Sequence, residues 1–139
     1  MLNKLLFGGE SGMSYAANAG SALLRIFAGI AMALGHGLGK LPPGEGLVER
    51  ATAMGFPAPT FFAWAAGLSE FGGGILLALG LLTRLSSLFI ALTMTVALIG
   101  VHWTDPFAAQ EKAFLFLFIA LCFLIKGSGD WSIDSYLRK

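Results

Sequence analysis

The sequence predicts an all-α protein in which four helices cross a membrane as a bundle. The first observation is composition: 56% of the 139 residues are hydrophobic and 12% are charged, about half the charged fraction of a soluble domain. The second is that apolar residues gather into four long runs, while a helix needs about 20 residues to cross the hydrocarbon core. A chain with so few charged residues cannot cover a soluble globule, so the membrane is its expected surroundings.

The apolar runs predict transmembrane helices over residues 19–38, 59–82, 86–101 and 111–125. A segment rich in Pro and Gly, residues 39–58, predicts a loop after the first helix, with a short interfacial helix over residues 47–54. Almost no loop separates the second and third helices, which are expected to form a tight antiparallel hairpin. The predicted organisation is an N-terminal tail (residues 1–18), a four-helix transmembrane domain (residues 19–134) and a C-terminal tail (residues 135–139).

The distribution of basic residues predicts the orientation. Four spans place both termini on one side of the membrane. The nine Lys and Arg residues divide into six on the side of the termini (Lys4, Arg25, Arg84, Lys126, Arg138 and Lys139) and three on the other (Lys40, Arg50 and Lys112). Because cytoplasmic segments carry an excess of Lys and Arg, both termini are predicted to be cytoplasmic.

One carboxylate, that of Glu70, stands near the middle of the second predicted span. A charged side chain at that depth costs roughly 2.5 kcal/mol or more, so it requires a partner, a proton or a function. At helical spacing Glu70 shares a face with Ala63, Gly67, Gly74 and Leu77. Small residues on that face let a second helix approach closely, so we expect Glu70 to face the interior of the bundle.

The ionisable residues of the first span fall on one stripe. Helical spacing aligns Arg25, Gly29, Met32, His36 and Lys40, which indicates a polar seam that faces inward. Arg25 lies roughly 6 Å from the midpoint of its helix, at a depth that would allow an ion pair with the carboxylate of the second span.

The expected Arg25–Glu70 ion pair has two interpretations. In the first, the pair is a structural latch between the first two spans. In the second, it is a proton or ligand site at the bottom of a cavity. Pairing of opposite charges would in either case explain how both groups are tolerated inside a membrane.

A second polar group is expected at the end of the bundle away from the termini, formed by His36, Lys40, His102 and Glu111. One interpretation is interfacial hydrogen bonding and ion pairing, such as Lys40–Glu111. Another is a vestibule for a quinone head group or a small substrate. Two His and a Glu could hold a metal, but their spacing follows no known ligand motif, so no metal site is predicted.

Other function classes are excluded or narrowed by the same residues. The net charge of +1 and the absence of a basic run interleaved with aromatics set nucleic-acid binding aside. Cys122 is the single cysteine, which excludes an intramolecular disulfide and a thiol-redox motif. It lies in an apolar run and is expected to be a buried packing residue. A redox role would therefore require a bound cofactor or the cofactor of a partner.

The sequence resembles the DoxX family of small four-helix membrane proteins, from about Ser21 to Asp134. The resemblance is carried by Glu70-Phe71-Gly72-Gly73-Gly74, by Gly80-Leu81-Leu82-Thr83-Arg84, by Glu111-Lys112-Ala113 and by Gly127-Ser128-Gly129-Asp130-Trp131-Ser132-Ile133-Asp134. The pattern Arg25…His36-Gly37…Lys40 completes it. The tail has Gly-Ser-Gly where Gly-Pro-Gly is common in such proteins. The matching ionisable positions are Arg25, His36, Lys40, Glu70, Arg84, Glu111 and Asp134.

The resemblance implies an integral membrane protein of the bacterial inner membrane. Some relatives are linked to quinone-dependent oxidation of sulfur compounds, or to membrane redox complexes that protect against oxidative stress. The leading expectation is therefore a redox-associated protein that binds a quinone or docks a soluble or membrane oxidoreductase. Glu70 would handle protons, Arg25 would be its charge partner, and His36 would donate to a quinone carbonyl. Lys40, His102 and Glu111 would line the same site.

Two other function classes stay open. One is a protein for the permeation of small solutes or for proton-coupled permeation, in which the polar seam lines a pathway. The other is a non-catalytic scaffold in which the buried charges only hold helices together. Beyond the lipid bilayer, the sequence leaves open the substrate, the electron partner, the existence of a homodimer and whether the protein is an enzyme.

Overall fold

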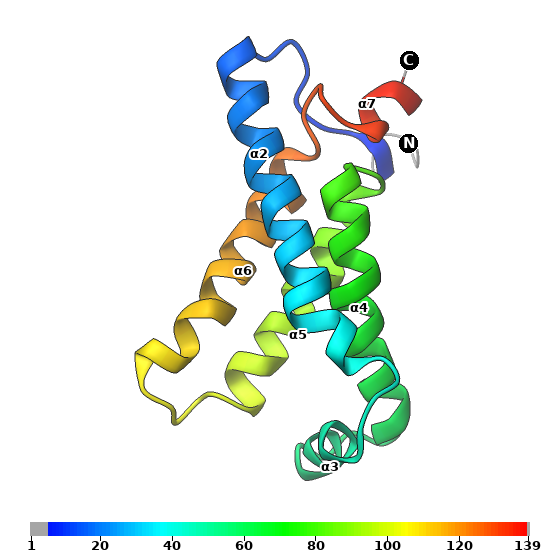
Figure 1. The fold of residues 1–139 in the computed structure, drawn as a ribbon, viewed down its shortest axis with the longest axis vertical. Coiled ribbons are helices and arrows are strands. Elements are labelled where there is room, and N and C mark those ends of the chain that lie inside the picture. The colour runs from blue at the N-terminus through cyan, green and yellow to red at the C-terminus, as the bar shows by residue number, and fades with distance from the viewer. Residues whose placement is uncertain (1–5, 139) are drawn as a thin grey trace.

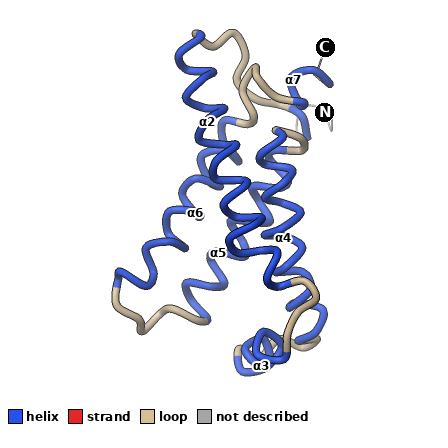
Figure 2. The backbone as a smooth tube through the Cα atoms, in the orientation of Figure 1, coloured by secondary structure: helices blue, strands red, loops and turns tan. Residues whose placement is uncertain are grey.

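The computed structural model describes residues 6–138, and within that range the regular secondary structure is helical (Figures 1 and 2). Four helical segments are long and apolar enough to cross a membrane: Tyr15–Lys40, Pro59–Leu79, Thr83–Gly100 and Phe107–Lys126. The first contains α2 (Tyr15–Met32), and the other three are α4, α5 and α6. The shorter helices are α3 (Glu45–Ala53) and α7 (Ile133–Leu137). The predicted all-α, four-helix architecture is confirmed.

The helices pack in chain order. Helix α2 packs on α4, α4 on α5, and α5 on α6, whereas α2 and α6 share few contacts. Figure 1 shows α6 diverging from α2 toward the end of the bundle that carries α3. We call this end, formed by residues 38–58 and 101–106, the loop end. The opposite end, formed by residues 6–14, 80–83 and 127–138, carries both termini and is called the termini end.

The first span does not stay α-helical to its end. After Met32 the chain forms a π-helical turn, Ala33–Gly37, and then a 3-10 turn, Leu38–Lys40. Irregular backbone within a membrane span is tolerated where it is buried in protein or lines a cavity, and π-helical turns occur frequently at functional sites. The span therefore extends from Tyr15 to Lys40, beyond both predicted limits.

The fourth span is also longer than predicted. Helix α6 begins at Phe107, directly after Pro106, and ends at Lys126, which gives 20 residues. Pro is compatible with a helix start because its fixed φ suits the helix and no internal hydrogen bond is lost there. The predicted start at Glu111 was one turn late, because two charged residues were taken as the boundary.

Glycine residues allow α2 and α4 to cross at close range. A Cβ added at Gly29 would lie 2.5 Å from the carbonyl oxygen of Gly74, and one added at Gly74 would lie 2.7 Å from that of Gly29. The two backbones therefore touch, as small residues at helix interfaces permit. Gly29 therefore stands where α2 crosses α4.

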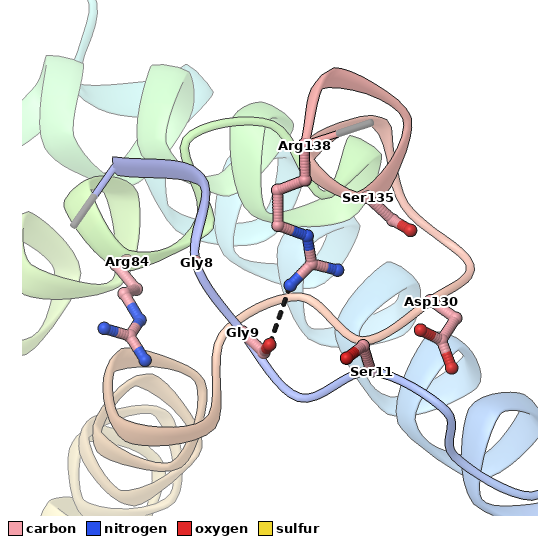
Figure 3. Close-up of a pocket in the computed structure, with 7 residues that line it drawn as sticks. All are labelled: Gly8, Gly9, Ser11, Arg84, Asp130, Ser135 and Arg138. Carbon is pink, nitrogen blue, oxygen red and sulfur yellow. Dashed lines mark hydrogen bonds between the residues drawn. The ribbon is translucent and has the colours of Figure 1, made fainter. Parts of the chain in front are cut away.

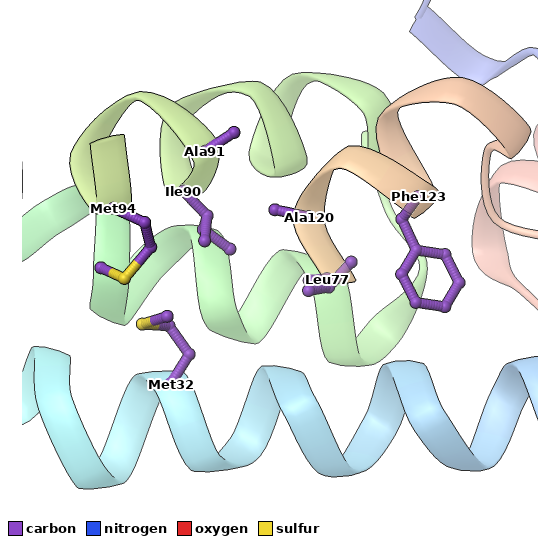
Figure 4. Close-up of a cluster of buried hydrophobic side chains, with 7 residues drawn as sticks. All are labelled: Met32, Leu77, Ile90, Ala91, Met94, Ala120 and Phe123. Atoms are coloured by element: carbon purple, nitrogen blue, oxygen red, sulfur yellow. The ribbon is translucent and has the colours of Figure 1, made fainter. Parts of the chain in front are cut away.

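The apolar core lies between the four spans. Its buried members come from all four spans (Figure 4): Met32, Leu77, Ile90, Ala91, Met94, Ala120 and Phe123. The expectation that Cys122 is buried was wrong, because its side chain is exposed on the outside of α6. An apolar run alone does not tell a core position from a lipid-facing one, since both favour the same residues.

The two tails pack against each other at the termini end. The amide of Glu10 donates to the carbonyl oxygen of Lys126 at 2.9 Å, and the guanidinium of Arg138 donates to the carbonyl oxygen of Gly9 at 2.8 Å. The tail predicted over residues 1–18 thus divides in the structure. Residues 15–18 belong to α2, residues 8–13 lie on the C-terminal segment, and residues 1–5 are outside the described range.

Candidate functional site

Glu70 forms an ion pair with Lys40 rather than with Arg25. Both carboxylate oxygens of Glu70 lie 2.6 Å from the Lys40 ammonium. Glu70 is 1% exposed on the inner face of α4, whereas the side chain of Lys40 is 35% exposed at the end of the first span. The pair therefore joins a buried carboxylate to a cation that reaches the surface of the protein. The predicted inward orientation of Glu70 is confirmed, and its predicted partner was wrong.

The local backbone explains this pairing. A Cβ added at Gly67 would lie 2.8 Å from the carbonyl oxygen of Lys40, and one added at Gly37 would overlap the backbone of Phe71. Two glycines thus let the irregular end of the first span lie directly on α4, on both sides of Glu70. The backbone of Lys40 therefore contacts α4 about one helical turn from Glu70. The Lys40 side chain spans that distance to the carboxylate. Regular helical spacing in the first span did not predict this approach.

Arg25 instead binds carbonyl oxygens at the other end of α4. Its guanidinium donates to Leu77 at 2.9 Å, to Ala78 at 2.8 Å and to Trp131 at 2.8 Å. Leu77 and Ala78 belong to the last turn of α4, whose carbonyls lack partners within the helix and where a cation is favoured. Leu77 is about 10 Å along the helix from Glu70. The expected Arg25–Glu70 pair is therefore replaced by a helix cap formed by an arginine that is 2% exposed.

Asp134 caps the next helix beside Arg25. Its carboxylate accepts hydrogen bonds from the amides of Leu82 at 2.7 Å and Thr83 at 2.9 Å, at the start of α5. Leu82 has a positive φ of 50°, an uncommon backbone conformation for a residue other than glycine. A cation at the end of α4 and an anion at the start of α5 both match the helix dipoles, and together they stabilise the short α4–α5 turn.

Asp130 ties the N-terminal segment to the same end. Its carboxylate accepts hydrogen bonds from the amide of Met13 at 3.0 Å, from the amide of Gly12 at 3.3 Å and from the side chain of Asn18 at 3.0 Å. The Asn18 side chain, followed by the Met13 amide, lowers the pKa of this carboxyl group below its ordinary value, because hydrogen bonds to the charged form favour it. The termini end is thus held by charged groups whose partners are mostly backbone.

His36 takes no part in the Lys40–Glu70 pair and packs against α6. The His36 ring is half-buried in the π-helical turn and lies edge-on to Phe116 of α6, with 5.3 Å between ring centroids. Within residues 6–138 its ring nitrogens form no hydrogen bond that meets ordinary geometric limits. The predicted stripe therefore divides: Lys40 turns toward α4, and His36 turns toward α6 across the seam where α2 and α6 share few contacts.

The structure does not bring His102 and Glu111 into the same group. His102 Nδ1 lies 2.7 Å from a carboxylate oxygen of Asp105 in the α5–α6 loop, and Gln110 donates to three backbone carbonyls of this loop. Glu111 is exposed on α6. In the part of the chain that the structure describes, Glu111 forms no ion pair, so the expected Lys40–Glu111 bridge was wrong. No three His, Cys, Asp or Glu side chains among these residues gather as a metal site would require.

Sequence reasoning anticipated that small residues such as Gly67, one turn before Glu70, let another backbone contact α4. It missed the partner of Glu70, which the sequence did signal. Lys40 belongs to the same stripe as Arg25, and its long side chain can extend along the helix to reach a buried partner. The capping roles of Arg25 and Asp134 had a weaker signal, because they depend on where α4 ends and where residues 127–134 return.

Comparisons with known proteins support the family resemblance over residues 20–103. The family model described as DoxX matches residues 20–103. The chain is 32% identical over 121 residues to "Putative oxidoreductase CatD" of Bacillus subtilis, which covers 86% of this chain and 88% of that protein. It is 34% identical over 110 residues to "Uncharacterized membrane protein Rv3486" of Mycobacterium tuberculosis, covering 69% of this chain and 66% of that protein.

No solved structure matches the chain significantly. The family model spans more than half of the chain, including Arg25, His36, Lys40 and Glu70. This match and the relative of similar length from Bacillus subtilis show that the chain is a membrane protein of the DoxX family.

Proposed function

We propose that the protein is a redox-associated protein that binds a quinone at the loop end, with the Lys40–Glu70 pair as its proton-handling group. The observation that carries the proposal is the ion pair itself: a carboxylate that is 1% exposed inside a membrane span joined to a lysine that is 35% exposed. Ionisable residues within membrane spans commonly mark proton relays or ligand pathways. Here one partner is buried and the other reaches the surface.

A quinone is the ligand class that matches this setting. Reduction of a quinone adds one proton for each electron, so its site needs both a proton source and a hydrogen-bond donor for a carbonyl oxygen. The Lys40–Glu70 pair supplies the first, with Lys40 exchanging protons with water as Glu70 passes one inward. The half-buried His36 ring supplies the second, since its nitrogens are not engaged by other residues of the described range.

The seam between α2 and α6 is the proposed entry route. The two helices share few contacts, and His36 and Phe116 meet across that seam. A quinone dissolved in the bilayer would approach from the side, and its ring would lie against Phe116 with a carbonyl oxygen near His36. Electrons would come from a soluble or membrane oxidoreductase docked on the protein. The name of the Bacillus subtilis relative supports a redox role of this kind.

We infer that the protein lies in a bacterial inner membrane with both termini in the cytoplasm. The excess of Lys and Arg on the side of the termini supports this orientation, and the two relatives are bacterial proteins.

The test compares quinone binding by wild-type protein and by Glu70→Gln in lipid nanodiscs. Ubiquinone and menaquinone are added, unbound quinone is removed, and bound quinone is measured by mass spectrometry. Glu70→Gln keeps the shape of the side chain and removes its charge, so we expect expression to be retained and quinone binding to be lost. Glu49→Gln is the matched control, because it makes the same change at an exposed position of α3 and should bind like the wild type.

Three further measurements test the proposal. Wild-type protein that contains no quinone and binds none when supplied would overturn the proposal. Proton or small-anion flux in liposomes that disappears in Glu70→Ala would instead favour the permeation function. His36→Leu should weaken quinone binding while leaving the Lys40–Glu70 pair intact, whereas His36→Gln, which keeps a donor, should retain more of it.

A further inference from the structure

A pocket of about 550 Å³ at the termini end is lined by two arginines and two serines. Figure 3 shows Arg84 and Arg138 on either side of the Gly8–Gly9 segment, with Ser11 and Ser135 nearby. Asp130 is the one acidic residue of the lining. The pocket lies far from Lys40 and Glu70, at the opposite end of the bundle, and the proposed quinone function does not use it.

The positive charge of Arg84 has little compensation from the protein. Its guanidinium donates one hydrogen bond, to the carbonyl oxygen of Ile125 at 3.0 Å, although an arginine has five N–H donors. Its Nε is buried and has no hydrogen-bond partner among the described residues. No carboxylate of residues 6–138 forms an ion pair with it. Arg84 also lies in the first turn of α5, where the helix dipole favours an anion over a cation.

The acidic residue of the lining does not neutralise Arg84. The Asp130 carboxylate accepts hydrogen bonds from Gly12, Met13 and Asn18, which turn it toward the N-terminal segment. Arg138 lies nearer to it and donates to the carbonyl oxygens of Gly9 at 2.8 Å and Gly129 at 3.3 Å. The pocket thus presents a net positive charge and hydroxyl groups.

We propose that this pocket binds the phosphate group of an anionic phospholipid. Arginine pairs readily with phosphate because its planar guanidinium offers two parallel donors, and basic pockets between membrane helices bind anionic head groups. Arg84 is the second residue of α5, and α6 ends at Lys126, so the pocket lies at the depth where spans meet the head-group layer. The neighbouring Ile125 side chain is 76% exposed and offers an apolar surface to the acyl chains.

The test measures lipid binding by native mass spectrometry of the full chain in mild detergent. Phosphatidylglycerol and phosphatidylcholine are titrated separately into the wild type and the variants Arg84→Gln and Arg138→Gln. We expect the wild type to prefer phosphatidylglycerol and Arg84→Gln to bind it about tenfold more weakly, since each charge-assisted contact is strong. Arg50→Gln, the same change on the exposed surface of α3, is the matched control and should bind like the wild type.

A second arm separates a lipid from a soluble anion. Inorganic phosphate is added in the absence of lipid, and the midpoint of thermal unfolding is measured. One outcome is that phosphate raises the midpoint of the wild type but not that of Arg84→Gln, while the wild type shows no preference for phosphatidylglycerol. The pocket would then be a phosphate site for a soluble anion. If Arg84→Gln does not fold, Arg84→Lys keeps the charge and should retain most of the lipid preference. Equal binding of both lipids by the wild type with no response to phosphate, or unchanged binding in both Gln variants, would overturn the proposal.

Discussion

Buried charged side chains have different kinds of partners at the two ends of the bundle. At the termini end, Arg25 and Asp134 are both buried, and each is surrounded by several backbone partners. At the loop end, Glu70 is equally buried, and within residues 6–138 its one partner is the Lys40 ammonium. A charged group with many fixed hydrogen bonds cannot change protonation or partner without breaking the fold. A carboxylate whose partner is one partly exposed lysine has fewer such constraints, which supports the loop end as the proposed proton-handling site.

The backbone conformation also differs between the two ends of the bundle. The α4–α5 turn at the termini end is closed by Gly80 with a φ of 67° and by Leu82, and both flanking helix ends are capped. At the loop end the first span ends in π and 3-10 turns. Regular helix ends with satisfied caps stabilise a structure, whereas π-helical turns are rare and occur frequently at functional sites. This difference supports the proposal that the termini end stabilises the fold and that the loop end carries the ligand site.

The largest effect on stability is expected from Arg25→Met. This change removes three hydrogen bonds and leaves the carbonyl oxygens of Ala78 and Trp131 without a donor, whereas that of Leu77 keeps the amide of Gly80. A buried acceptor left without a donor costs about 1–3 kcal/mol, and this change leaves two such acceptors. The free energy of unfolding, measured by denaturant titration in detergent, should fall by that amount for each acceptor, and Glu70→Gln should lower it by much less. An equal loss for the two variants would remove the distinction between the ends.

A smaller effect is expected from adding a methyl group at the close approach of the first span to α4. Gly37→Ala places a Cβ against the backbone of Phe71, whereas Gly35→Ala, two residues away, meets nothing within 4 Å. Overpacking typically costs about 1–3 kcal/mol. The thermal midpoint of Gly37→Ala should fall, and that of Gly35→Ala should stay or rise because Ala favours helix. Since Gly37→Ala moves the end that carries Lys40, quinone binding should weaken as well.

The smallest effect is expected from the protonation of Asp130. Its pKa is lowered in the folded protein by the Asn18 side chain and the Met13 amide. A lowered pKa contributes stability that is present above the unfolded value of about 3.9 and is lost as pH falls through the folded pKa. As the pH is lowered below about 4, the thermal midpoint of the wild type should therefore fall more steeply than that of Asp130→Asn. Identical pH profiles would show that Asp130 does not hold the N-terminal segment.

Much of the fold was predictable because composition and periodicity respond to the membrane directly. The four spans, the short hairpin between the second and third, and the buried face of α4 follow from where apolar and small residues stand. Glu70 was correctly placed inside, since a lipid-facing carboxylate at that depth is costly. The prediction that Cys122 is buried was wrong, because the core side and the lipid side of a membrane helix carry similar apolar residues.

By itself, the sequence determined that the chain forms a four-helix membrane bundle with a charged interior, because burial in lipid constrains composition residue by residue. The tertiary structure alone decided which charges meet. Arg25 binds carbonyls of α4 and Lys40 takes Glu70, since glycines at positions 37 and 67 bring the end of the first span onto α4 and the C-terminal segment returns to the α4–α5 turn. Such pairings depend on where backbones touch, and many arrangements of the same spans would satisfy the same hydrophobic pattern.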